Sequence, residues 1–300
     1  MTGFDHQTVL LQECLAAIDP QPGAFLVDVT AGGGGHAAAL WAASQGEGRL
    51  LCVDRDERAV AHLRARFAEW GERVQVVHGA FGDLLEVLED AGPGTVDGLI
   101  ADLGVSSPQL DEGERGFSFR HDGPLDMRMD RSTGDTALEL IERCDERSLA
   151  DLLFKYGEER RSRPIARSIL RALAQGSLRT TGDLRHAVVR AVGPQRGRVD
   201  PSTRTFQALR IVVNDELGQL TRLLAMLPDL LADNGVAAII SFHSLEDRLV
   251  KHAFRDDERL EPLQRRPVIA GDEERALNPR ARSAKLRAAR RVVRAVEVTL

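Results

Sequence analysis

Four consecutive glycines, Gly32–Gly35, lie between an apolar segment, Phe25–Val29, and an alanine-rich segment, Ala37–Ala43. Glycine adopts positive φ angles and lets the backbone approach a ligand closely, and the first turn of a helix presents N–H groups that have no partner within the helix. The next apolar segment ends at Asp54, where a carboxylate can accept hydrogen bonds from ribose hydroxyls. This order of residues predicts a strand–loop–helix–strand unit that binds a nucleotide cofactor.

The residue types around the glycines distinguish between two cofactors. The run can be fitted to the dinucleotide fingerprint as Gly32-x-Gly34-x-x-Ala37, but four glycines in a row satisfy many patterns. Asp28, at the end of the first apolar segment, would repel a pyrophosphate and would attract the cationic amino-acid end of S-adenosylmethionine. We therefore expect S-adenosylmethionine, with a dinucleotide as the alternative and a ligand-free turn as the least favoured reading.

Composition excludes several classes of protein. The chain has 300 residues, 43% of them hydrophobic, and a formal net charge of −6. Its three cysteines are far apart and form no CxxC pair. We therefore expect no disulfide, no zinc site and no other bound metal. The first residues contain no long apolar run, which excludes a signal peptide and a membrane partner and favours a cytoplasmic protein.

Apolar segments typical of strands alternate with helical patterns. The expected strands are Phe25–Val29, Leu50–Asp54, Val74–His78, Val96–Leu103, Val236–Ser241 and, at or near an edge, Val292–Thr299. Such alternation predicts a mostly parallel sheet. The middle third of the chain shows no convincing strand, and Thr136 begins a capping box with Glu139. A structureless loop of that length is improbable, so we expect an inserted helical domain over 109–212 and a core domain over 1–108 and 213–300.

Basic residues are concentrated in two zones of this acidic chain. Thirteen Lys and Arg against four acids lie between Lys155 and Arg210, and eight against none lie between Arg275 and Arg294. Two basic zones on an acidic body are consistent with a bound polyanion. Helices with solvated arginine faces explain the same pattern equally well, so the charge distribution alone does not establish RNA binding.

Segments with polar residues follow five of the expected strands. They are the glycines and His36 after the first strand, Asp54 at the second, His78–Phe81 after the third, Asp102–Gln109 after the fourth and Ser241–Asp247 after the fifth. Ligands of open α/β sheets bind beyond the carboxyl ends of the strands. The convergence of these segments predicts one crevice, in which Phe81 is placed to flank an adenine.

Seven blocks of the chain carry a resemblance to a known family. They are Asp28–His36, Asp102–Asp111, Gly116–Phe119, Pro124–Met129, Thr205–Arg210, Ser241–Asp247 and Asn278–Arg287. Together they resemble the bacterial 16S rRNA (cytosine-N4)-methyltransferase family known as RsmH or MraW. The resemblance implies a class I, Rossmann-like methyltransferase with a mostly parallel seven-stranded sheet and an inserted all-helical domain that recognises substrate. It also implies S-adenosylmethionine as the methyl donor. The acceptor it implies is N4 of a decoding-centre cytosine of 16S rRNA, position 1402.

The resemblance also implies a set of site residues. The cofactor contacts would be Gly34, Gly35, His36, Asp54, Phe81, Asp102 and Gln109. The partner would be 16S rRNA within the small ribosomal subunit, bound by a monomer or homodimer.

Methyl transfer to an amino nitrogen needs mainly in-line alignment of nitrogen, methyl and sulfur and an acceptor for an amine hydrogen. Asp102 is the main catalytic candidate, with Ser107 and His243 as weaker ones. Many amino-methylating enzymes carry an Asp/Asn-Pro-Pro-aromatic run after this strand, and here no aromatic residue follows Ser107-Pro108. The candidate substrate-binding residues are Phe117, Phe119, His243, Arg280, Arg282 and Lys285, with Phe242 as a further candidate for base stacking.

Two other functions are compatible with parts of this pattern. An NAD(P)-dependent dehydrogenase would share the first two strands and would have no need of basic zones. A non-catalytic RNA-binding or assembly factor on the same scaffold would bind RNA and transfer no methyl group.

Overall fold

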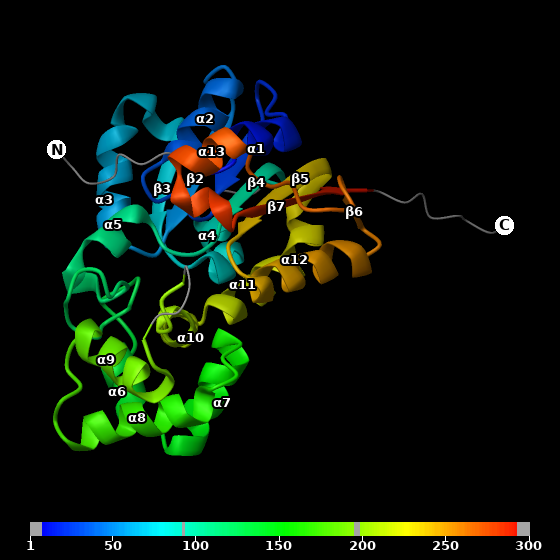
Figure 1. The fold of residues 1–300 in the computed structure, drawn as a ribbon. Helices are drawn as coiled ribbons and strands as arrows, with labels where there is room; N and C mark the ends of the chain where they lie inside the picture. The colour runs from blue at the N-terminus through cyan, green and yellow to red at the C-terminus, as the bar shows by residue number, and fades with distance from the viewer. Residues whose placement is uncertain (1–7, 92–93, 195–198, 293–300) are drawn as a thin grey trace. The chain divides into compact units, whose positions relative to one another are not determined.

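The chain forms two compact units, residues 1–104 with 217–300, and residues 105–216 (Figure 1). We describe a computed structural model, in which residues 8–91, 94–194 and 199–292 are described. The expected boundaries, after 108 and after 212, lie close to these. Each unit has its own apolar core, so each is described by itself.

The first unit is built on a seven-stranded sheet. Its strands are β1 Phe25–Asp28, β2 Arg49–Asp54, β3 Val74–His78, β4 Val96–Asp102, β5 Leu231–Ser241, β6 Leu260–Pro262 and β7 Lys285–Arg291. The strand order is β3-β2-β1-β4-β5-β7-β6, with β7 antiparallel to both of its neighbours and the other pairings parallel. The expected class I methyltransferase fold with a mostly parallel seven-stranded sheet is confirmed.

Helices cover both faces of the sheet because side chains along each strand alternate between two cores. Leu26, Cys52 and Ile100 belong to one core, whereas Val27, Val53 and Leu99 belong to the other. The first core is covered by α1 Leu11–Ile18, α2 Gly35–Ala43 and α3 Glu57–Arg66, and the second by α4 Leu84–Ala91, α11 Glu216–Leu230 and α12 Ser244–Asp256. The short helix α13 Asp272–Leu277 precedes β7.

Three strands differ from the sequence prediction by more than one residue, and one of them, β6, was identified by no sequence pattern. β5 begins at Leu231, ahead of the expected start at Val236, and its register against β4 shifts where Asn234 adopts a φ of 66°. The predicted strand Val292–Thr299 lies outside the described residues except for Val292. The last described strand is instead Lys285–Arg291. Its sequence does not alternate between apolar and polar residues, so periodicity did not identify it as a strand. It lies between β5 and β6, so β6 forms the edge.

In the described part of the second unit the regular elements are helices joined by loops, apart from one isolated bridge between Pro124 and Thr180. Its helices are α5 Ser107–Asp111, α6 Ala137–Glu142, α7 Glu146–Gly157, α8 Ser162–Ala174, α9 Thr181–Val192 and α10 Thr203–Val213. The predicted capping box is present, with the Glu139 N–H donating to Thr136 Oγ1 at 3.2 Å. Sequence patterns did not identify α5, which contains Pro108 at its second position, or α10, which follows a segment with glycine and prolines.

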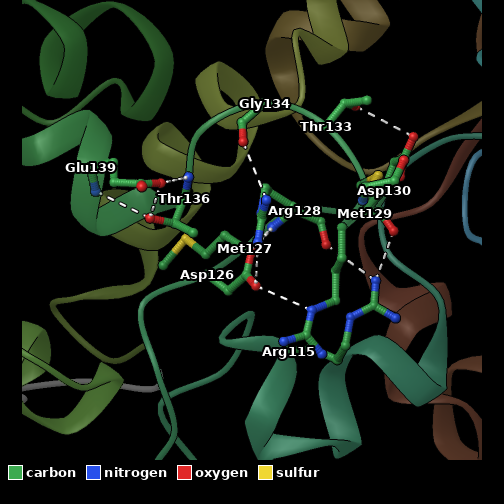
Figure 2. Close-up of polar contacts among 12 residues, drawn as sticks. Arg115, Asp126, Met127, Arg128, Met129, Asp130, Thr133, Gly134, Thr136 and Glu139 are labelled. Atoms are coloured by element: carbon green, nitrogen blue, oxygen red, sulfur yellow. Dashed lines mark hydrogen bonds and ion pairs between the residues drawn. The ribbon is translucent and has the colours of Figure 1, made fainter.

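A polar network orders the loop before α6, a segment rich in Gly, Arg and Asp (Figure 2). Arg115 is 3% exposed, and its Nη2 donates to the carbonyls of Arg128 and Met129 at 3.1 and 2.8 Å. Asn214 Nδ2 donates to the Met127 carbonyl at 2.7 Å, and Asn214 Oδ1 accepts from the Met129 N–H at 2.8 Å. Met127 has a φ of 62°, so buried side chains hold this backbone where sterics alone would not.

We expect Asn214→Ala to destabilise the protein by about 2–4 kcal/mol, because it leaves a buried N–H and a buried carbonyl without these partners. Urea unfolding followed by circular dichroism measures this change. The control is Thr133→Ala at the exposed tip of the same loop, for which we expect about 0.5 kcal/mol or less. Equal effects of the two variants would contradict a supporting role for Asn214.

Candidate functional site

Three aspartates end neighbouring strands at one rim of the sheet. Asp28 at the end of β1 is in register with Cys52 of β2 and Ile100 of β4. Asp54 and Asp102 lie two residues further along those strands, toward the carboxyl end. The parallel register therefore brings together the three carboxylates that sequence analysis had singled out, at the edge where α/β sheets bind ligands.

The glycine loop connects β1 to α2 through two residues in the left-handed region. Gly32 has a φ of 51° and Gly34 a φ of 78°. A Cβ atom at Gly34 would lie 2.6 Å from the Phe67 ring, so a larger residue would have to displace that ring. The Arg66 guanidinium donates to the Gly33 carbonyl. The loop thus leads directly into the first turn of α2, whose N–H groups are not used within the helix.

Asp54 holds this loop through its carboxylate. Its Oδ2 accepts the Gly32 N–H at 2.7 Å, and its Oδ1 accepts the Asp56 N–H at 2.8 Å. Burial raises the pKa of Asp54 to about 6, although both hydrogen bonds oppose that shift. Asp54 therefore fixes the loop conformation in addition to any contact with a ribose.

Asp28 is almost completely buried below the loop. It is 1% exposed, and its Oδ1 accepts the Thr30 N–H at 3.1 Å. The Thr30 hydroxyl in turn accepts the Asp102 N–H at 2.6 Å, so Thr30 links two of the strand ends. Burial, with a smaller contribution from the charges of Asp102 and Asp54, raises the pKa of Asp28 to about 7. A cation bound nearby would favour the ionised form.

His36 and Phe81 occupy different environments at this rim. His36 is 6% exposed in the first turn of α2, and its Nε2 lies 3.1 Å from the Val9 carbonyl oxygen. Burial lowers the pKa of His36 to about 4, so the ring is neutral at neutral pH and Nε2 donates to that carbonyl. Phe81 begins a short 3-10 helix after β3 and packs partly against the core beneath α4 and α11.

Ser107 and Gln109, two further predicted site residues, belong to the second unit. Ser107 begins α5, which Ser106 caps. Gln109 is 5% exposed, and its Oε1 accepts the Ser106 N–H at 3.0 Å within the capping box. Within its own unit Gln109 thus shapes the first turn of α5, and its cofactor contact stays a prediction.

The segment after β5 contributes an aromatic ring and a capped helix. His243 is the N-cap of α12, and its Nε2 lies 3.1 Å from Glu246 Oε1. Phe242 is half-buried beside Gly104 at the end of β4, where a Cβ atom would lie 3.6 Å from the ring. The Arg280 guanidinium lies 5.9 Å from the centre of the Phe242 ring. Phe242 and Arg280 therefore form an aromatic–cation pair next to the strand that carries Asp102.

Acids of the same unit neutralise part of the second basic zone. Asp247 on α12 accepts from Lys285 Nζ at 3.1 Å and from Arg287 Nε at 2.7 Å. Asp247 is partly buried, which raises its pKa, and the two cations outweigh this and hold the pKa below its ordinary value. Arg282 is exposed and donates from Nε to the Arg275 carbonyl. Of the predicted RNA contacts in this zone, Lys285 is thus paired with a carboxylate, whereas Arg282 donates to a main-chain carbonyl.

Phe117 and Phe119 lie in the second unit and contribute to its core. Phe117 is 6% exposed among buried residues such as Leu125 and Ile141. Phe119 is half-buried and meets Phe206 edge-on, with 5.3 Å between ring centres. A ring this buried has little face to offer a base, so the placement favours a packing role for Phe117, and the predicted stacking role of both residues stays untested.

Sequence reasoning missed Thr30, Arg66 and the partner of His36. Thr30 and Arg66 act through main-chain atoms of residues distant in sequence, and no local pattern reports such contacts.

Among the residues that the structure describes, no helix is both long and apolar enough to span a membrane.

We expect the affinity for S-adenosylmethionine to rise as the pH increases through about 7, because the cation binds the ionised form of Asp28. Asp28→Asn should weaken binding and remove this rise. Since the raised pKa means that ionised Asp28 weakens the folded state, the ligand-free variant should also be more stable than wild type at about pH 8. Calorimetric titrations and urea unfolding test both statements, with the exposed Glu86→Gln as control. A wild-type affinity that does not change with pH would contradict the assignment.

Comparisons with known proteins identify the family of this chain. The model of the MraW methylase family matches residues 3–292. A ribosomal RNA small subunit methyltransferase H of Sorangium cellulosum is 58% identical over 97% of this chain and 92% of its own length. A protein of the same name from Synechococcus sp. (strain CC9605) is 51% identical over 98% of this chain and 100% of its own.

These matches confirm the family resemblance drawn from the sequence. A methylase family also confirms S-adenosylmethionine as the predicted cofactor, in place of the dinucleotide alternative. The chain belongs to the MraW methylase family.

Proposed function

We propose that this protein transfers the methyl group of S-adenosylmethionine to ribosomal RNA of the small subunit. The observation that carries this proposal is the rim of three aspartates and a glycine loop in a chain whose relatives are named ribosomal RNA small subunit methyltransferase H. The acceptor atom we propose is N4 of the decoding-centre cytosine at position 1402, as the family resemblance implies.

The donor half of the site uses the glycine loop and the strand ends. The Gly34 and Gly35 amides, at the start of α2, bind the carboxylate of the cofactor. Asp28 contributes negative charge beneath its cationic groups, and Asp54 accepts ribose hydroxyls at the tip of β2. Phe81 flanks the adenine. Asp102, Gln109 and the main chain of His36 are the remaining proposed cofactor contacts.

The acceptor half uses the end of β4 and the segment after β5. Asp102, or a carbonyl of the residues that follow it, accepts an N4 hydrogen and so raises the nucleophilicity of the amine as positive charge develops. Phe242 stacks the target base, because it is the candidate aromatic residue that adjoins the end of β4. Arg280 beside the ring holds a phosphate of the flipped nucleotide.

In-line alignment supplies most of the proposed rate enhancement. The methyl group on a sulfonium is already activated, whereas the lone pair of a cytosine amine is delocalised into the ring. Fixing nitrogen, methyl and sulfur in line removes an entropy cost of several kcal/mol. No strong base is required before attack, because the nitrogen proton becomes acidic once the methyl group has been transferred. Ser107 and His243 are therefore weaker catalytic candidates than Asp102.

The second unit serves as the RNA-recognition part in this proposal. Several exposed arginines lie on it, among them Arg163, Arg171 and Arg190, whereas Arg167 and Arg185 pair with Glu146 and Asp200. The substrate would be 16S rRNA in a small-subunit particle, met in the cytoplasm by a monomer or homodimer. A non-catalytic RNA-binding factor remains the alternative, and methyl transfer distinguishes the two.

Mass spectrometry of 16S rRNA from a strain that lacks this protein should show one decoding-centre cytosine without its N4 methyl group. Restoring the wild-type gene should restore that group. We expect Asp102→Ala to reduce turnover by about 100-fold or more and His243→Ala to reduce it less. The reverse order, measured on folded variants, would refute Asp102 as the catalytic residue, and an unchanged cytosine in the deletion strain would refute the enzyme.

Replacing Phe242 by leucine should raise the KM for RNA by about tenfold, because base–aromatic stacking contributes about 1–3 kcal/mol. Phe242→Tyr keeps a stacking ring and should stay near wild type. Phe119→Leu provides the matched control in the second unit and should leave the KM for RNA within about twofold, the expectation if Phe119 packs on Phe206 and does not stack a base. Steady-state methylation assays on folded variants give these values, and a larger effect at Phe119 would move the stacking role there.

A further inference from the structure

The segment Thr8–Leu10 is held against the cofactor loop by two hydrogen bonds from different parts of the first unit. His36 Nε2, in the first turn of α2, lies 3.1 Å from the Val9 carbonyl oxygen. On the other side, the Leu10 N–H donates to Glu274 Oε1 of α13 at 2.8 Å. These contacts join residues 27 and 264 positions apart in the chain, so they are part of the tertiary structure and not of a local turn.

The backbone of this segment is in a conformation that it would not adopt alone. Leu10 has a φ of 51° and a ψ of 35°, in the left-handed region that disfavours residues with a Cβ atom. Its side chain is fully buried, as is that of Val9, in the core that also contains Ala31, Ala37 and Ala281. Such a residue persists only where its surroundings determine its conformation, and Glu274 is the side chain that binds its N–H.

The segment lies directly on the part of α2 that would bind the cofactor. A Cβ atom added to Gly35 would overlap the hydroxyl of Thr8, so the Thr8 side chain packs against the start of α2 in space that the absence of a Cβ atom leaves free. Gly35 is the first residue of α2, and Gly34 is its N-cap. Any movement of Thr8–Leu10 would therefore change the position of the amides assigned above to the carboxylate of S-adenosylmethionine.

Glu274 lies in the same acidic neighbourhood as the strand ends. Burial first, and then nearby carboxylates that include Asp102 and Glu274, raise the pKa of the Cys14 thiol well above its ordinary value. Cys14 belongs to α1, which continues directly from Leu10. Glu274 is also followed, four residues on, by Asn278, where the block that carries Arg280 and Arg282 begins.

We propose that Glu274 and His36 are positioning residues. Their hydrogen bonds hold Thr8–Leu10 against the first turn of α2 and thereby keep the glycine loop in its cofactor-binding conformation. This inference rests on the proposed function for the identity of the cofactor. Neither side chain needs to touch the cofactor in this role. His36 acts through the Val9 carbonyl, and Glu274 acts through the Leu10 N–H.

The test compares four variants of the 300-residue chain, of which His36→Ala removes the ring that contacts the Val9 carbonyl. Glu274→Ala removes the acceptor of the Leu10 N–H, and Glu274→Gln keeps a carbonyl acceptor of the same length but removes the charge. Glu273→Ala removes a carboxylate from the exposed neighbouring position of α13. For each variant we would measure amide hydrogen exchange of residues 8–10, the Kd for S-adenosylmethionine by calorimetry, and KM and kcat for both substrates.

We expect Glu274→Ala to lose the protection of the Leu10 amide and to bind S-adenosylmethionine about tenfold more weakly, since it leaves the buried Leu10 N–H without its acceptor. The KM for the cofactor should rise by the same factor, with kcat and the KM for RNA within about twofold. Glu274→Gln and Glu273→Ala should stay near wild type. His36→Ala should shift the cofactor Kd in the same direction as Glu274→Ala.

Two results would overturn this positioning role. One is a folded Glu274→Ala protein with a protected Leu10 amide and an unchanged Kd. The other is a Glu274→Gln protein as impaired as Glu274→Ala, which would assign the effect to charge. Amide exchange in the ligand-free protein tests the positioning role alone, whereas methylation of rRNA by the wild type tests the proposed function. The two hypotheses can therefore fail separately.

Discussion

The hydrogen bond from the Gly32 N–H to the Asp54 carboxylate is the contact on which the site depends. It joins the loop after β1 to the end of β2, and it can form because the parallel register carries Asp54 two residues beyond the partner of Asp28. With Gly32 held, the chain turns through a second left-handed glycine, Gly34, into α2. A substitution that disturbed this bond would change the loop conformation, the direction of the first amides of α2 and the placement of His36 together.

The same rim carries an electrostatic cost in the absence of a ligand. Burial raises the pKa values of Asp28 and Asp54, and the charge of Asp102 adds to the effect at Asp28. Three carboxylates at adjoining strand ends repel one another in a low dielectric, so they weaken the fold as they ionise. A cationic ligand relieves that repulsion. An unfavourable interaction concentrated at one site of an otherwise consistent structure is typical of functional sites. Here the excess charge is negative, so it attracts a sulfonium cofactor and would repel a pyrophosphate.

The sequence predicted the features that depend on local pattern. Val74–His78 is a strand with the expected bounds, and the glycine run connects a strand to a helix as expected. Contacts between distant segments were beyond prediction, because the chain gives no sign that Glu274 meets Leu10. Aromatic residues near arginines in a polar loop indicated a stacking surface, yet Phe117 is buried. That loop proved ordered by Arg115 and Asn214, and buried polar side chains of this kind are invisible to hydrophobic periodicity.

Counting charges along the chain overstates the cationic surface available to RNA. Asp247 neutralises Lys285 and Arg287 within the first unit. Arg167 and Arg185 are neutralised in the same way within the second. Each paired cation already has a counter-charge, so it would release fewer ions on meeting a phosphate than an unpaired one. Electrostatic attraction to RNA therefore depends on the smaller set of exposed arginines without such a partner, and within the second basic zone that set includes Arg282. Under the proposed function, specificity for one cytosine would come from the shape and hydrogen bonding of the acceptor site, since phosphate contacts carry no sequence information.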